Sequence, residues 1–60
     1  MNQFEPSPIL IKLYPNRRFY DGEVGRYCSL DELKVWKERR IPFAIVDSKT
    51  GDDVTDTILS

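Results

Sequence analysis

A capping box at Ser29 and Glu32 constrains the fold of this 60-residue chain more than any other feature. The serine oxygen can accept the amide of residue 32, and the glutamate can reach back to the serine amide, so the pair predicts a helix that begins here. Leu30, Leu33 and Trp36 follow at a spacing that places them on one side of that helix. We therefore expect a helix in the middle of the chain, with Trp36 largely buried against a sheet built from the flanking segments.

Three short strands are predicted before the helix. Residues 9–14 alternate with a period of two, which is the pattern of a strand. The Pro-Asn pair at 15–16 favours a turn, because proline fixes φ and asparagine tolerates the next turn position. Residues 17–20 and 26–28 predict two further strands, with a tight connection that begins at 21–22. The three strands should form an antiparallel meander.

One more strand and the start of a second helix are predicted after the first helix. Pro42 ends that helix, and the continuous apolar run at 43–46 predicts a central strand that is covered on both faces. Gly51 supplies the positive φ of a turn. Thr55 is then expected to cap the second helix. Because the chain stops at Ser60, before two turns are complete, we expect the natural protein to continue.

Together these elements predict an α+β fold: a small antiparallel β-meander with one packed helix, followed by a further strand and the start of a second helix. The domain is expected to span residues 9–60, after a flexible lead-in at residues 1–8. A domain of this size buries only about 60% of its unfolded surface. Because one helix can cover only one face of the strand at 43–46, we expect a homo-oligomer, at least a dimer.

The composition disfavours several classes of protein. The chain has no histidine, so the usual general base and the commonest metal ligand are both absent, and we expect no enzyme, no metal site and no cofactor. The single Cys28 cannot form an internal disulfide, which fits a reducing cytoplasm. No segment is long and apolar enough for a signal peptide or a membrane span, so we expect a cytoplasmic protein that does not enter a membrane.

The stretch from residue 12 to 21 mixes cationic and aromatic side chains around the Pro-Asn turn. Tyrosines offer flat faces for stacking, while lysine and arginine donate charge-assisted hydrogen bonds to phosphate or carboxylate. The candidate binding residues are Lys12, Tyr14, Asn16, Arg17, Arg18, Tyr20 and Arg26. If Arg17 and Arg18 lie in a strand, they should point to opposite faces, unless the Pro-Asn turn twists both onto one edge. An equally strong alternative is that the aromatic residues face the core and the arginines are merely solvated.

The distribution of charge leaves room for a local basic face. The net charge is −1, which alone argues against a nucleic-acid binder. Residues 1–40, however, hold eight Lys and Arg against six Asp and Glu, whereas residues 41–60 hold one against four. The first part of the chain can therefore carry a local basic face despite the net charge.

Three motifs follow one another along the chain. They are Ile11-Lys12-x-Tyr14-x-Asn16-Arg17-Arg18-x-Tyr20-Asp21, then Tyr27-x-Ser29-Leu30-x-x-Leu33, then Val46-Asp47-x-Lys49-Thr50-Gly51-x-Asp53-Val54-Thr55. In this order they resemble the N-terminal DNA-binding domain of the polyhydroxyalkanoate (polyhydroxybutyrate) accumulation regulators. The resemblance covers residues 9–60.

The resemblance implies a function and a set of partners. The members of that family are bacterial transcriptional repressors of phasin and storage-polymer genes. The resemblance therefore implies that double-stranded DNA is the partner of this domain. It also implies association with polymer granules through regions that this chain lacks. Within the matching motif, Arg17 and Arg18 would contact phosphates or base edges, and Lys12 would neutralise the DNA backbone. Arg26, which lies outside the motif, would neutralise the DNA backbone as well. The alternative is a protein-interaction or oligomerisation module whose tyrosines and arginines bind another chain without DNA.

Overall fold

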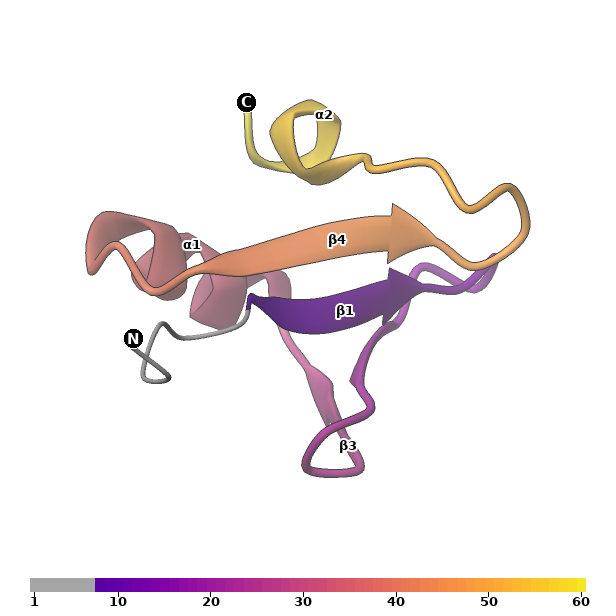
Figure 1. Cartoon of the computed structure of the whole chain (residues 1–60), viewed down its shortest axis with the longest axis horizontal. Helices are drawn as coiled ribbons and strands as arrows, with labels where there is room; N and C mark the ends of the chain where they lie inside the picture. Colours follow the sequence, from indigo (N-terminus) through magenta and orange to yellow (C-terminus); the bar gives the residue numbers. More distant parts are fainter. Residues whose placement is uncertain (1–7) are drawn as a thin grey trace, which may run out of the picture.

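A four-stranded sheet and two helices form two layers in the computed structural model, which describes residues 8–60 (Figure 1). The elements are β1 (Ile9–Leu13), β2 (Phe19–Asp21), β3 (Arg26–Cys28), α1 (Leu30–Glu38), β4 (Phe43–Asp47) and α2 (Thr55–Leu59). The predicted α+β class and the order of elements are confirmed. The lead-in predicted for residues 1–8 lies outside the described residues apart from Pro8.

The strands lie in the order β3-β2-β1-β4. The first three strands form the predicted antiparallel meander, whereas β4 pairs with β1 in parallel. The prediction that the strand at 43–46 is central is therefore wrong, because β4 lies at the edge of the sheet. The outer edge of β4 is covered by the chain that follows it: Val54 donates its amide to the Ile45 carbonyl at 2.8 Å, and the Ile45 amide donates to Thr55 Oγ1 at 2.8 Å.

The second strand begins at Phe19, so the prediction of a strand at 17–20 is wrong at its start. Arg17 donates its amide to the Tyr14 carbonyl at 2.8 Å, and Tyr14 donates to the Arg18 carbonyl at 3.0 Å. Arg17 has a φ of +66°. This is a three-residue hairpin loop in which a turn is followed by one residue in the left-handed region. Both arginines therefore belong to the loop and its exit rather than to β2.

The core lies between the sheet and the helices. Its buried apolar members are Ile11, Phe19, Leu33 and Ile45. The register places Ile11 opposite Ile45 and Leu13 opposite Phe19, so these strand residues share one face of the sheet, and Leu33 of α1 packs on them. Partly buried residues of α2 complete the cluster.

Trp36 is partly buried and packs against the core cluster, which agrees with the prediction that it lies against the sheet. Its ring lies edge-on to that of Phe43, with a centroid distance of 5.6 Å. Phe43 is the first residue of β4, and α1 lies at that end of the strand (Figure 1). One side of the indole therefore remains in contact with solvent at the border of the helix layer.

Both ends of α1 are satisfied locally. The capping box is confirmed, because Glu32 donates its amide to Ser29 Oγ at 3.1 Å and Ser29 donates its amide to Glu32 Oε1 at 3.0 Å. At the other end the Ile41 amide donates to the Trp36 carbonyl at 2.9 Å, and the Arg40 amide donates to the Lys37 carbonyl at 3.1 Å. Arg40 has a φ of +60°. This pair of bonds is a Schellman motif, in which arginine occupies the position that usually carries glycine.

The second helix begins where predicted but is not capped by Thr55. Its N-cap is Val54, which makes no side-chain cap. Thr55 Oγ1 accepts the Ile45 amide and donates to Asp53 Oδ1 at 2.6 Å, so its hydroxyl joins α2 to β4 instead. The prediction that Thr55 is a cap is wrong because a partner ten residues away, at the edge of β4, takes the side chain.

Replacing Leu33 by alanine should lower the free energy of unfolding by about 2–5 kcal/mol, because the side chain is fully buried and its removal leaves a cavity. Lys34→Ala, which changes the exposed neighbour on the same helix, should shift it by no more than about 0.5 kcal/mol. Urea unfolding followed by circular dichroism measures both. Equal midpoints for the two variants would contradict the assignment of Leu33 to the core.

Candidate nucleic-acid interface

One face of the sheet is turned away from the helices, and we call it the open face. Its strand residues alternate with those of the core, and the register places Lys12 opposite Tyr20 and Tyr20 opposite Tyr27. The residues of the open face are Leu10, Lys12, Tyr20, Tyr27, Ala44 and Val46, and none of them is buried. The open face therefore offers a mixed apolar and cationic surface to a partner.

Three tyrosines form a ladder across the open face. The rings of Tyr14 and Tyr20 lie 6.4 Å apart and those of Tyr20 and Tyr27 lie 5.1 Å apart, both edge to face. The guanidinium carbon of Arg18 lies 5.5 Å from the centroid of the Tyr27 ring. Such an arrangement holds the arginine by a cation–π contact while its donors stay available. Tyr14 and Tyr20 also border a groove of about 230 Å³, together with Leu10, Lys12, Gly22 and Glu23.

The loop between β1 and β2 is fixed by its own hydrogen bonds. Asn16 Oδ1 accepts the Arg18 amide at 3.1 Å, so the asparagine shapes the loop. Arg17 adopts the left-handed conformation, in which a residue with a Cβ crowds its own carbonyl oxygen. Within residues 8–60 neither Arg17 nor Arg18 forms an ion pair. The loop thus presents two unneutralised guanidinium groups on a defined backbone.

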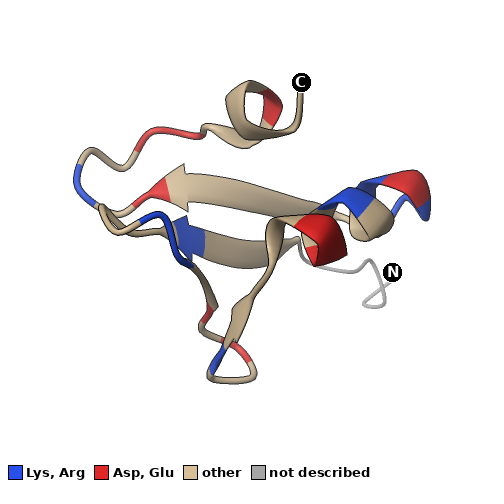
Figure 2. Ribbon diagram, turned by 180° about the vertical axis from the view of Figure 1, so that it is seen from behind, with Lys and Arg blue, Asp and Glu red and all other residues tan. Residues whose placement is uncertain are grey.

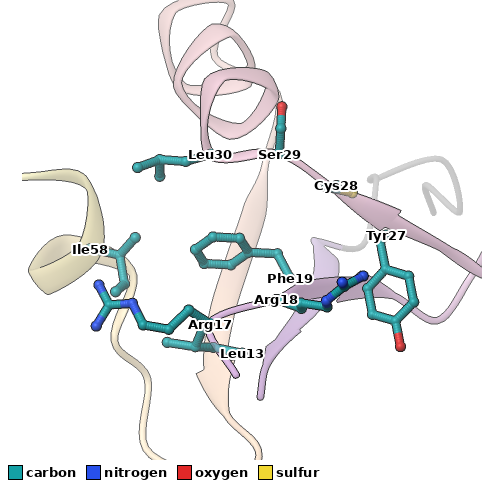
Figure 3. A pocket seen from close by; sticks show the side chains of 9 residues that line it. All are labelled: Leu13, Arg17, Arg18, Phe19, Tyr27, Cys28, Ser29, Leu30 and Ile58. Atoms are coloured by element: carbon teal, nitrogen blue, oxygen red, sulfur yellow. The ribbon is translucent and has the colours of Figure 1, made fainter. Parts of the chain in front are cut away.

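Arg17 and Arg18 leave this loop in opposite directions. Figure 3 shows Arg17 extending toward Ile58 of α2 and Arg18 toward Tyr27. The expectation that they point to opposite faces of a strand does not apply, because neither lies in a strand. Both border a pocket of about 420 Å³ whose apolar walls are Leu13, Phe19, Leu30 and Ile58. Burial raises the pKa of the Cys28 thiol in the same wall, which favours its protonated form at neutral pH.

Arg26 lies apart from the other predicted residues. The register places it opposite Asp21 on the core side of the sheet, and its Nη2 contacts Glu32 Oε2 of α1 at 2.6 Å. The hydrogen bond with Glu32 raises the pKa of Arg26 above its usual value. The structure therefore brings together Lys12, Tyr14, Arg17, Arg18 and Tyr20 around the open face and the loop, and it places Arg26 against α1.

Two residues absent from the sequence-based set lie close to this cluster. Tyr27 completes the tyrosine ladder, and the strand periodicity of 26–28 could have shown that it shares a face with Tyr20. Lys49 follows β4, and the parallel pairing of β1 and β4 brings it to the end of the sheet that carries the β1–β2 loop. Lys and Arg segments gather at that end in Figure 2. No local pattern at Lys49 indicates this position.

A protein-family model for the PHB/PHA accumulation regulator DNA-binding domain matches residues 10–60. The chain belongs to this family. The resemblance inferred from the three motifs is thereby confirmed, and the family is a DNA-binding regulator domain and not a class of enzymes. Neither helix of residues 8–60 is long and apolar enough to cross a membrane.

The chain is similar to two curated bacterial proteins. An uncharacterized protein of Allochromatium vinosum is 44% identical over 53 residues, which cover 88% of this chain and 35% of the relative. A protein of Thiocystis violacea, called "Uncharacterized protein in phbA 5'region", is 42% identical over 53 residues, which cover 88% of this chain and 38% of the relative. The chain thus spans less than two-fifths of the length of these relatives. No solved structure matches the chain.

The Glu32 carboxylate should make the stability of the domain sensitive to acid. The Ser29 amide and then Arg26 hold its pKa below the ordinary value of 4.5. A lowered folded-state pKa contributes stability that is present above the unfolded pKa and is lost as the pH falls through the folded value. Glu32→Gln retains a side chain that can complete the capping box but cannot titrate. We expect it to unfold with a weaker acid dependence below about pH 4.5 in thermal melts.

Glu38→Gln is the matched control, because Glu38 lies at the other end of α1 and accepts no side-chain hydrogen bond within residues 8–60. It should keep the acid dependence of the parent chain. If Glu32→Gln and the parent lose stability in parallel as the pH falls, the carboxylate of Glu32 has no such linkage.

Proposed function

We propose that this domain binds double-stranded DNA as part of a bacterial transcriptional regulator that represses genes of polyhydroxyalkanoate synthesis and phasins. The family match carries this proposal. The name of the Thiocystis violacea relative places that protein in a phbA 5' region, which supports a regulatory link to storage-polymer genes. A regulator of this kind acts on chromosomal DNA, and therefore in the cytoplasm. Granule association would reside in parts of the regulator outside this domain.

The geometry of the open face supports a way of contacting DNA. The major groove admits a two-stranded β-ribbon, and β2 and β3 form such a ribbon. Lys12 and Arg18 would contact phosphates or base edges on either side of the tyrosine ladder, and Tyr14 or Tyr20 would pack against sugar. Arg17 and Asn16 would place the β1–β2 loop in contact with the sugar-phosphate backbone of the DNA. Arg26 would add charge only if it left Glu32, so we assign it the weakest contribution.

A comparison of two left-handed arginines tests the DNA contact of the loop. Arg17→Gly and Arg40→Gly each remove one positive charge and each place glycine at a positive φ, so both should leave stability equal or higher. Only Arg17→Gly should weaken duplex binding, with a fall of about one unit in the log–log slope of affinity against salt. Arg40→Gly should bind as the parent does, because Arg40 caps the far end of α1.

The measurement is fluorescence anisotropy of labelled duplexes from the promoters of the polyhydroxyalkanoate and phasin genes, with a scrambled duplex beside them, at several salt concentrations. Specific binding would appear as tighter affinity for the promoter duplexes at equal salt. Identical affinities and slopes for the two glycine variants would rule out a contact between Arg17 and DNA.

The outer side of α1 supports self-association. Val35 is 44% exposed and borders, with Trp36 and Ile41, a groove of about 410 Å³. The rim of this groove is acidic at the start of the helix, at Asp31, and basic at its end, at Arg39. A second copy packed antiparallel about Val35 would place each acidic end opposite a basic end, which is the self-complementary pattern of a two-fold interface. We infer that a second copy of this chain is the partner of this surface.

Charge reversal tests this dimer. Asp31→Arg should abolish the association because it places two cations against each other, and the double variant Asp31→Arg with Arg39→Asp should restore it. Sedimentation equilibrium over a wide range of concentrations measures the association. A monomeric parent chain, or a double variant as dissociated as the single one, would refute the interface. A dimer without affinity for any duplex at low salt would favour the interaction module over the DNA-binding domain.

A further inference from the structure

Two loops that are distant in sequence meet at one end of the sheet. The β1–β2 loop, residues 14–18, follows β1, and the β4–α2 loop, residues 48–54, follows β4 (Figure 1). Because β1 and β4 are parallel, with Leu13 opposite Asp47, both loops leave the sheet at the same end. Ser48 donates its amide to the Leu13 carbonyl at 3.0 Å and joins them.

A groove of about 190 Å³ lies between the two loops. Its lining residues are Leu13, Tyr14, Pro15, Arg17, Asp47 and Lys49. The two cations come from different loops, and within residues 8–60 neither forms an ion pair. We call this the two-loop groove.

The carboxylate in the two-loop groove is occupied by its own turn. Asp47 Oδ1 accepts the amides of Lys49 at 2.8 Å and of Thr50 at 3.2 Å. The turn is closed further by the Gly51 amide, which donates to the Asp47 carbonyl at 2.8 Å. These bonds involve backbone amides, so the ammonium group of Lys49 is presented from a preorganised turn and is not needed to hold it.

The two-loop groove and the groove of the open face share one lining residue. Tyr14 lines this groove and also the groove of the open face that holds Lys12 and Tyr20. A duplex that lies on the tyrosine ladder would therefore bring its sugar-phosphate backbone next to Arg17 and Lys49. Two cations from separate loops are suited to a phosphate group, whose oxygens accept hydrogen bonds in several directions.

We propose that Arg17 and Lys49 together hold one DNA phosphate in the two-loop groove, which makes Lys49 a DNA-binding residue. The inference rests on the proposed DNA-binding function and extends its interface from the open face to the loop after β4. It also gives a reason for the left-handed backbone of Arg17, since strain of this kind persists where the surroundings or the function require it.

Lys49→Gln tests the contact and Lys37→Gln controls it. Lys37 is an exposed lysine in the last turn of α1, at the opposite end of β4, so its replacement removes the same charge at a distance from the groove. Lys49→Gln should lower duplex affinity and reduce the log–log salt slope by up to about one unit, while Lys37→Gln should change neither. Both variants should keep the thermal melt of the parent, because the turn at Asp47 uses the backbone amide of residue 49.

The double variant Arg17→Gly with Lys49→Gln tests whether the two cations share a phosphate. If they do, the loss of affinity in the double variant should be smaller than the combined losses of the single variants. If the fold-loss of affinity in the double variant equals the product of the two single fold-losses, the two cations do not share a phosphate. Equal duplex affinities for Lys49→Gln and Lys37→Gln would also refute the proposed contact. A parent chain that binds no duplex would instead refute the proposed function itself, so the two failures are distinguishable.

Discussion

The parallel pairing of β1 with β4 is the contact on which the rest of the structure depends. Ile11 and Ile45 face each other across this pair, and Leu33 of α1 packs with them; all three side chains have no solvent exposure. They come from three separate elements, β1, α1 and β4. In a domain with so few fully buried side chains, this contact joins the meander to the segments that follow it. Loop-closure entropy opposes such a distant pairing, so the burial of these three residues must offset it.

The pairing of β1 with β4 also determines which side chains face the core and which face solvent. It fixes which face of β1 meets the helices, so Lys12 and the tyrosines remain on the other face. Four carboxylates meanwhile accept backbone amides of their own loops or caps: Asp21, Glu32, Asp47 and Asp53. Their charges are tied to turns and to a helix start, while the cations of the β1–β2 loop stay without ion pairs among residues 8–60. A chain with a net charge of −1 can therefore still offer a local cationic surface.

Features that depend on nearby residues were predictable from the sequence. The capping box at Ser29, the positive φ of Gly51 and the strand at 26–28 all follow from interactions within a few positions, and the structure confirms them. One error is also local, because the hairpin loop takes residues 17 and 18 out of the second strand. The other two errors concern long-range partners. The central position expected for the strand at 43–46 failed because residues 53–55 cover its edge. The prediction that Thr55 caps the second helix is wrong for a similar reason, because its hydroxyl accepts the Ile45 amide of β4.

The candidate site shows the same division. The motif around residues 12–20 is contiguous in sequence, so its clustering was predictable. Lys49 lies in the acidic last third of the chain, and only the parallel register brings it near Arg17. Arg26 has the right charge, but it lies on the core side of the sheet and its side chain pairs with Glu32 of α1. The family resemblance covered all these positions without separating those that face the candidate interface from those that stabilise the fold. Their roles in DNA binding remain predictions.

The two left-handed arginines show how a stability argument bears on function. A residue with a Cβ at this φ costs about 1–2 kcal/mol relative to the right-handed region, and glycine would avoid the cost. For Arg40 the compensation is local, because a cation beside the C-terminus of α1 interacts favourably with the helix dipole. Arg17 lies in the β1–β2 loop and closes no helix. Arg17 instead lines the groove that also holds Lys49, and the proposed phosphate contact there would offset the cost of its left-handed backbone.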